Sequence, residues 1–370
     1  MEKISALRLF LKKEVIMRYA LFVLFILIIP INFLKAQKTI DLKVVSVSSG
    51  RTVDTVFGSW KFSVADYEFM NDKLMLLTFK KNMSEASLKL TDETQKIISS
   101  FDLPDEAEKL YKDYQGFTNV ICTNHIYRIS IENDIIKLSS LPVEQYKNFV
   151  MPCIDTLGKD VFFSNFQQDY PAFTYYAYNS ASKKLTPFKT VCDQELMDGY
   201  NMEYYFLKGK DQLYAKRIAD QYGLDFHRVA ANMTGLTTSM YYTPLYAPLF
   251  VINDTVCVFD HYSNAILKYD RKQRLLDSVH IDYNHPKNWK EWKHEVIVDK
   301  VTNEVYALYE KGGFYCLKNI DMKTGKIKGS FKLTNQYVDK IKVKNGSVYY
   351  VYRPFESLQE KFVYKELISY

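Results

Sequence analysis

Short polar turns recur along this chain at nearly even spacing, and each separates two short runs of apolar and β-branched residues. From the first turn to the last they span 274 residues in six intervals, about 46 residues each. Hairpin turns at such a period are typical of a repeat built from antiparallel meanders. The seven turns are Asn71-Asp72, Thr123-Asn124, Gly158-Lys159-Asp160, Gly209-Lys210-Asp211, Asn253-Asp254, Thr302-Asn303 and Asn345-Gly346.

Two segments near the C-terminus can be aligned over their whole length. One runs from Phe250 to Ile281 and the other from Val296 to Leu333. Each contains four short strand-like runs joined by three tight turns, which is the pattern of a β-propeller blade. We therefore predict an all-β fold, a β-propeller of six or seven four-stranded blades, in a single domain over residues 37–370.

The remaining sequence agrees with this prediction and leaves the blade number open. The chain has 30 Tyr and 24 Phe, residues that suit a pleated, half-buried surface. We expect helical inserts only at residues 104–115 and 284–294, and residues 215–245 fit strands poorly. The last unit shows three good strands, so we predict that the mature N-terminal strand, Thr39 to Val47, completes the last blade. Such closure leaves no exposed sheet edge.

An apolar run at residues 20–34 follows several basic residues and precedes Ala36-Gln37. This layout predicts a signal peptide, residues 1–36, cleaved after Ala36. A retained membrane anchor is the alternative, but a span needs about 20 apolar residues, and this run is shorter and contains Pro30. Met17 also begins a leader of more usual length, so residues 1–16 can be an upstream start. We expect export to the periplasm, the outer surface or the medium, with no stable membrane span after cleavage.

Removing the leader removes most of the positive charge. The whole chain has 49 Lys and Arg against 43 Asp and Glu, a net charge of +6. Residues 1–36 hold six of the basic and two of the acidic residues, so the remainder has a net charge of +2. Nucleic-acid binding requires a concentrated basic surface, and the sequence shows none, so we expect no nucleic-acid partner.

The five cysteines lack the spacing of a zinc site. Cys122, Cys257 and Cys316 lie in strand-like apolar runs, where cysteine is typically a small buried hydrophobe. Cys153 and Cys192 flank one predicted blade, and their pairing stays open.

The repeated strand and turn pattern resembles that of a known family. The run from Leu249 to Phe259 with its Asn253-Asp254 turn, the following run Ile266 to Asp270 and the leader ending in Lys35-Ala36-Gln37 resemble exported six-bladed β-propeller proteins of Bacteroidetes. That family is similar to NHL-repeat and TolB-like propellers. The resemblance covers about residues 38–370, rests on core and turn residues, and implies six blades and an exported location. It brings no catalytic residues, and this chain lacks a lipoprotein cysteine.

One histidine group is a candidate metal site. His280 and Asp282 share one side of a predicted strand, and His285 follows in the next loop. Two imidazoles and a carboxylate can ligate a transition metal, although polar loop residues are more often simply solvated. We predict no cofactor.

Two aromatic loops are candidate binding surfaces. Trp289 and Trp292 stand three residues apart, so a short helix would place them on one face. Tyr241 and Tyr242 lie in a segment without strand alternation, and exposed Tyr offers a flat ring with a hydroxyl. For both loops the alternative is ordinary packing onto the propeller.

No nucleophile-elbow, zinc-protease or phosphate-loop motif is present in the sequence. We therefore expect a monomeric, non-catalytic binding module for a glycan, peptide or protein partner. The alternative is a propeller hydrolase or lyase with a carboxylate or metal site at the central channel.

Overall fold

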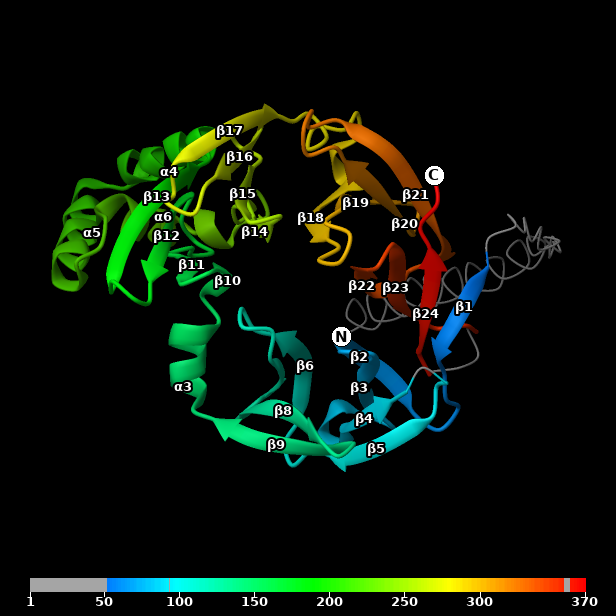
Figure 1. The fold of residues 1–370 in the computed structure, drawn as a ribbon. Coiled ribbons are helices and arrows are strands. Elements are labelled where there is room, and N and C mark those ends of the chain that lie inside the picture. The colour runs from blue at the N-terminus through cyan, green and yellow to red at the C-terminus, as the bar shows by residue number, and fades with distance from the viewer. Residues whose placement is uncertain (1–51, 93, 356–359) are drawn as a thin grey trace, which may run out of the picture. The chain divides into compact units, whose positions relative to one another are not determined.

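The computed structural model describes residues 52–92, 94–355 and 360–370, which belong to one compact unit, Thr52–Tyr370. Its strands form six four-stranded antiparallel sheets arranged in a ring, with one edge strand of each sheet toward the centre (Figure 1). The fold is thus a six-bladed β-propeller, as one of the two predicted blade numbers required. The leader prediction lies outside the described residues.

The blades follow one another along the chain. Blade 1 contains β2 (Ser63–Met70), β3 (Lys73–Phe79), β4 (Ser87–Thr91) and β5 (Ile97–Asp102), and blade 2 contains β6 (Ala107–Lys112), β7 (Thr118–Cys122), β8 (Ile126–Glu132) and β9 (Ile135–Leu141). Blade 3 contains β10 (Cys153–Leu157), β11 (Asp160–Ser164), β12 (Ala172–Asn179) and β13 (Lys184–Cys192), and blade 4 contains β14 (Leu249–Ile252), β15 (Thr255–Asp260), β16 (Ala265–Tyr269) and β17 (Leu275–His280). Blade 5 contains β18 (Trp292–Val298), β19 (Val305–Lys311), β20 (Phe314–Ile320) and β21 (Ile327–Gln336), and blade 6 contains β22 (Asp339–Lys344), β23 (Ser347–Tyr352), β24 (Phe362–Leu367) and β1 (Val53–Phe57).

An N-terminal strand closes the ring, as predicted, but it is a different strand. β1 pairs antiparallel with β24, with Val53 opposite Glu366, and Phe57 is buried in the core between blades 6 and 1. The predicted strand, Thr39 to Val47, lies outside the described residues. β1 occupies the place in blade 6 that we assigned to it.

Six of the seven predicted turns are hairpins of the observed blades. Five join the first two strands of a blade, and Thr123-Asn124 joins β7 to β8. Asn253, Asp254 and Gly346 have positive φ angles of 48°, 58° and 69°, which the tight hairpin turns require and which Asn, Asp and Gly tolerate. The seventh turn, Gly209-Lys210-Asp211, is wrong because these residues begin a helix.

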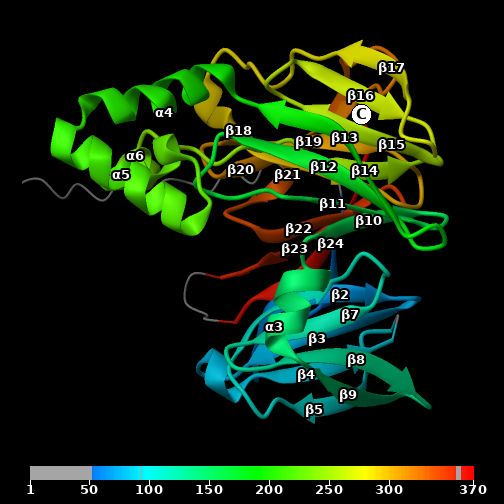
Figure 2. The same cartoon turned by 90° about the vertical axis from the view of Figure 1, so that its left-hand side faces the viewer.

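Three helices are inserted between blades 3 and 4, contrary to our expectation for this region. They are α4 (Gln194–Phe206), α5 (Gly209–Tyr222) and α6 (Phe226–Thr234), and they project from one end of the blades (Figure 2). The side chains of Asp193 and Asp225 cap α4 and α6, and Gly223 ends α5 at a φ of 64°. The shorter helical segments are η1 (Met83–Glu85), α3 (Val143–Gln145), η2 (Tyr146–Val150), η3 (Leu236–Thr238) and η4 (Trp289–Glu291).

Neither of the two predicted inserts forms an α-helix in the structure. Residues 104–115 contain strand β6, and residues 284–294 contain only the single turn η4 before β18 begins. Over the described residues, none of the helices has the length and apolar character needed to cross a membrane.

Neighbouring blades are joined mainly by shared apolar cores. In the described part of the chain, five of the six neighbouring pairs share such a core, each drawn from both blades. The exception is the pair of blades 2 and 3. There the face of blade 2 that is turned away from blade 1 is covered by the connector of α3 and η2, whose Tyr146 packs against Ile121 and Ile126.

The inner strands show a second difference at the same junction. Directly after a bulge in β2, Asp66 accepts a hydrogen bond from the backbone N–H of Leu110 in blade 2, at 3.1 Å. Asp155, at the same place in β10, accepts one from Val251 N–H in blade 4, also at 3.1 Å. The corresponding residue of blade 2 is Lys109, whose side chain cannot accept a hydrogen bond.

Candidate functional site

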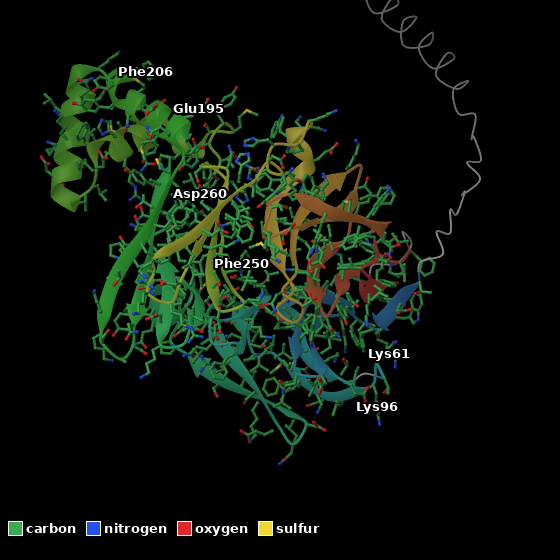
Figure 3. All side chains as sticks on the ribbon, turned by 45° about the horizontal axis from the view of Figure 1, so that its top comes forward. Lys61, Lys96, Glu195, Phe206, Phe250 and Asp260 are labelled. Carbon is green, nitrogen blue, oxygen red and sulfur yellow. The ribbon has the colours of Figure 1, made fainter. Side chains whose placement is uncertain are left out.

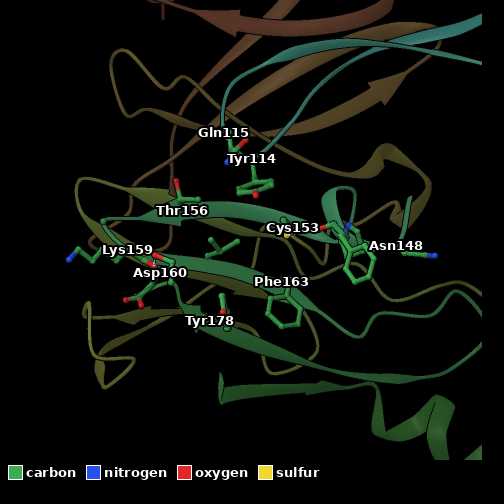
Figure 4. A pocket seen from close by; sticks show the side chains of 14 residues that line it. Tyr114, Gln115, Asn148, Cys153, Thr156, Lys159, Asp160, Phe163 and Tyr178 are labelled. Carbon is green, nitrogen blue, oxygen red and sulfur yellow. Dashed lines mark hydrogen bonds between the residues drawn. The ribbon is translucent and has the colours of Figure 1, made fainter. Parts of the chain in front are cut away.

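A cleft of about 760 Å³ lies between blades 2 and 3, where the shared core is missing (Figure 4). One wall is blade 3, and the other consists of the β6–β7 turn and the end of the connector. It is lined by Tyr114, Gln115, Asn148, Phe149, Pro152, Cys153, Thr156, Gly158, Lys159, Asp160, Val161, Phe163, Tyr178 and Ser180.

Strand alternation explains the aromatic wall of blade 3. Successive side chains of a strand point to opposite faces of its sheet. Phe162 of β11 and Tyr175 of β12 are buried in the core shared with blade 4, so Phe163 and Tyr178 point toward blade 2. Both line the cleft, and Phe163 stacks on Tyr176 with ring centroids 5.6 Å apart.

The opposite wall is held by a hydrogen-bonded turn. The buried Asp113 carboxylate accepts backbone N–H bonds from Gln115 and Phe117, each 3.0 Å long, and Arg128 Nη2 lies 3.2 Å from its second oxygen. This fixes Tyr114 at the cleft edge, where burial, with smaller contributions from Cys153 and Asp113, raises the pKa of its hydroxyl.

Polar groups border the rings. Asp160 accepts a bond from Asn179 Nδ2 at 2.6 Å, which fixes its carboxylate. The amides of Gln115 and Asn148 and the ammonium group of Lys159 belong to exposed residues. Flat rings interleaved with a few hydrogen-bonding groups can bind a small amphipathic ligand.

All five cysteines are free, so Cys153 and Cys192 do not pair. β10 and β13, which carry them, are the two opposite edge strands of the blade 3 sheet. Cys153 Sγ instead lies 3.1 Å from the Phe149 carbonyl oxygen, and burial raises its thiol pKa.

A second hollow, of about 520 Å³, lies at the inner strands of blades 1, 2, 5 and 6. Most of its charged side chains are paired: Lys340 Nζ is 3.4 Å from Asp66, and Lys293 Nζ donates to Glu310 at 2.7 Å. Glu295 has no ion pair within the described residues. Its side chain is exposed, yet the walls of the hollow raise the pKa of its carboxyl by desolvation. The positive charge of Lys293 opposes this rise.

The predicted tryptophan pair does not form one face. Trp289 is exposed in η4, whereas Trp292 begins β18 and is buried. Trp292 stacks on His294, with ring centroids 4.2 Å apart, and meets His261 edge-on. The pair separates because the helix ends after one turn and the strand turns Trp292 inward.

The two tyrosines predicted to form a binding surface also differ in exposure. Tyr241 is exposed, and Tyr242 is buried in a small core with Tyr200 and Ala231 of the helical insert. Only Trp289 and Tyr241 of the four candidate ligand-binding residues are therefore available to a ligand, and neither lines the cleft.

The predicted metal residues do not meet as a ligand set. β17 ends at His280, so the alternation that related it to Asp282 stops there, and His285 Nε2 lies 2.7 Å from Asn264 Oδ1. Over the part of the chain that the structure describes, no three His, Cys, Asp or Glu side chains are grouped to hold a metal ion.

The sequence interpretation missed the residues that line the cleft. Alternation in the run from Phe173 to Tyr178 does place rings on both faces of one strand, which was a usable signal. What the sequence does not reveal is that the neighbouring blade leaves one of these faces partly uncovered.

The chain matches no protein-family model and no curated protein sequence. Among solved structures it is similar to a luciferin-regenerating enzyme, at 8% identity over 86% of this chain and 96% of that chain, with a TM-score of 0.39. It is similar to a virginiamycin B lyase from Staphylococcus aureus, at 12% identity over 86% and 99%, with a TM-score of 0.38. A putative gluconolactonase gives 9% identity over 87% and 95%, with a TM-score of 0.38. These likenesses concern the fold alone, and the fold assignment rests on the sheet topology described above.

Proposed function

We propose that this protein is an exported, non-catalytic β-propeller that binds a glycan in the cleft between blades 2 and 3. The supporting observation is the lining of that cleft, in which the rings of Tyr114, Phe163 and Tyr178 alternate with amide, hydroxyl and charged groups. Sugar rings present an apolar face and a hydroxyl edge, so they match such a lining.

Export belongs to the same proposal. The basic residues, apolar run and Ala36 of the leader support it, as does the resemblance to exported Bacteroidetes propellers. N-terminal sequencing of the protein from its native cells should give Gln37. A native N-terminus at Met1 or Met17 would contradict cleavage.

Binding can be tested on the chain from Gln37 onward, which contains every strand of the ring. We expect it to bind members of an oligosaccharide array, with affinities then measured by calorimetry. Tyr178→Ala and Phe163→Ala should each weaken binding at least tenfold, about 1.4 kcal/mol. Tyr178→Phe keeps the ring and should bind nearly as well as the parent.

The exposed ring of Trp289 supplies the matched control. Trp289→Ala removes a large exposed aromatic outside the cleft and should leave the affinity unchanged. Capture of peptides but no oligosaccharide would overturn the glycan assignment. Equal loss in Trp289→Ala and Tyr178→Ala would overturn the assignment to the cleft.

A second candidate function rests on Glu295. A carboxyl with a raised pKa in a water-reached channel is suited to general acid catalysis, as a hydrolase or lyase would need. If the channel is catalytic, Glu295→Gln should abolish turnover of chromogenic glycosides and leave binding in the cleft intact. Unchanged turnover in that variant would exclude this role.

A further inference from the structure

The outer end of the helical insert exposes large apolar side chains. The exposed fractions are 65% for Tyr205, 70% for Phe206, 71% for Leu213 and 45% for Tyr214. Figure 3 places Phe206 at the far end of the insert from the blades. We call this segment, residues 205–217, the elbow, because it joins the end of α4 to the start of α5.

Packing inside the insert does not explain these exposed side chains. The buried residues of α5 are Ala215 and Ala219, which pack with Val229 of α6. Leu213 and Tyr214 of the same helix are exposed. Ile218 of α5 packs against the same core. A helix of a globular protein normally buries its large apolar residues and exposes small or polar ones, so Leu213 and Tyr214 depart from the pattern that the rest of α5 follows.

The elbow is also basic. It contains Lys208, Lys210, Lys216 and Arg217 against a single carboxylate, Asp211. In the described structure none of the four cations forms an ion pair with a carboxylate. Arg217 lies over the ring of Tyr214, 5.2 Å from its centroid, and Lys216 over that of Tyr204, at 5.6 Å. Arg217 therefore flanks an exposed ring, whereas Lys216 lies over a half-buried one. All four cations remain available to an external anionic group.

We infer that the elbow docks on the surface of an anionic lipid bilayer. Apolar and aromatic side chains flanked by Lys and Arg are typical of helices that lie at the boundary between headgroups and acyl chains. Anionic headgroups attract nearby cations, which gives the charge complementarity. The elbow is the protruding end of two helices (Figure 2), a shape that can enter a fluid headgroup layer without a matching pocket.

Co-sedimentation with lipid vesicles tests this inference on the chain from Gln37, which lacks the apolar leader. The vesicles are pure phosphatidylcholine, or phosphatidylcholine with about one third phosphatidylglycerol. We expect binding to the anionic vesicles, weak binding to the neutral ones, and loss of binding at high salt. Lys208→Gln with Lys210→Gln should reduce partitioning roughly 25-fold, since each charge near the surface contributes about fivefold.

Matched variants separate the apolar and charged parts of the elbow. Phe206→Ala with Leu213→Ala should weaken binding to both vesicle types. Leu276→Ala with Lys272→Gln changes an exposed apolar side chain and a lysine of blade 4 and should have no effect. The inference is overturned if the anionic vesicles do not bind the parent chain, or if the elbow variants bind as the parent does. Capture of a protein by the elbow in place of vesicles would also overturn it.

Discussion

His261 is a buried histidine of blade 4 with both ring nitrogens in hydrogen bonds. Its Nδ1 lies 2.8 Å from the Tyr246 carbonyl oxygen and its Nε2 lies 2.8 Å from the Tyr283 hydroxyl. The carbonyl can only accept, so Nδ1 carries the proton and Nε2 accepts from the tyrosine, which is the neutral imidazole. Burial lowers the pKa of His261 to about 4.

This environment predicts a pH-dependent stability. Between pH 6.5 and pH 4 the unfolded chain binds a proton at His261 and the folded chain does not, so stability falls as the pH falls through that window. We expect a loss of about 2 kcal/mol in the free energy of unfolding from pH 7 to pH 5, measured by urea titration. His261→Gln should be less stable at pH 7 and should lose correspondingly less at pH 5.

The exposed His280 serves as the control for this prediction. His280→Gln should reproduce the pH dependence of the parent chain. If His261→Gln also reproduces it, another group is responsible. The sequence could not single out His261, because its lowered pKa arises from packing against Trp292 and Tyr283, which follow it by 22 residues or more.

At the scale of elements, the sequence predicted strands better than helices. Hairpin turns depend on local residues such as Asn253-Asp254 and Asn345-Gly346, so they could be located without the structure. The insert was missed because Gly209-Lys210-Asp211 resembles a turn, although Asp193 and Asp225 as caps and Gly223 and Gly235 as terminators were present as signals. Amphipathic periodicity is weak in α4 and α5 and stronger only in the short helix α6.

The insert should be separable from the ring. Its buried residues form two small cores that involve few ring residues. We expect a chain with residues 199–238 replaced by a short Gly-Ser linker to retain the strand signal in circular dichroism and to bind oligosaccharide in the cleft. The same chain should no longer bind anionic vesicles. Loss of folded structure in this variant would show that the insert supports the ring.

At the scale of the whole molecule, closure depends on five residues at the start of the described chain. Two chains, one starting at Thr52 and one at Gly58, differ only in β1 and its flanking residue. Without β1, the β24 edge is open and the core between blades 6 and 1 loses Phe57. We expect a loss of at least about 3 kcal/mol in the free energy of unfolding and concentration-dependent association on size-exclusion chromatography. Equal stability of the two chains would contradict closure by β1.

The ring could be predicted from the sequence, but the cleft could not. A period of about 46 residues follows from turns that each blade specifies locally. The gap between blades 2 and 3 arises because these two blades do not form a common apolar core. Blade 2 has Lys109 where blades 1 and 3 have a carboxylate. This difference indicates the gap, but it can be recognised only after the blades are aligned on their bulges.

The junction between blades 2 and 3 lacks a shared apolar core, so a ligand bound there can change the rigidity of the propeller. Five junctions are held by apolar cores, whereas blades 2 and 3 are linked through a connector and face each other across a cleft. A ligand that touches both walls supplies contacts the chain omits, and at a concentration of 100 Kd it adds about 2.7 kcal/mol to stability. We therefore expect a bound ligand to bridge blades 2 and 3 and to restrict the motion of one relative to the other.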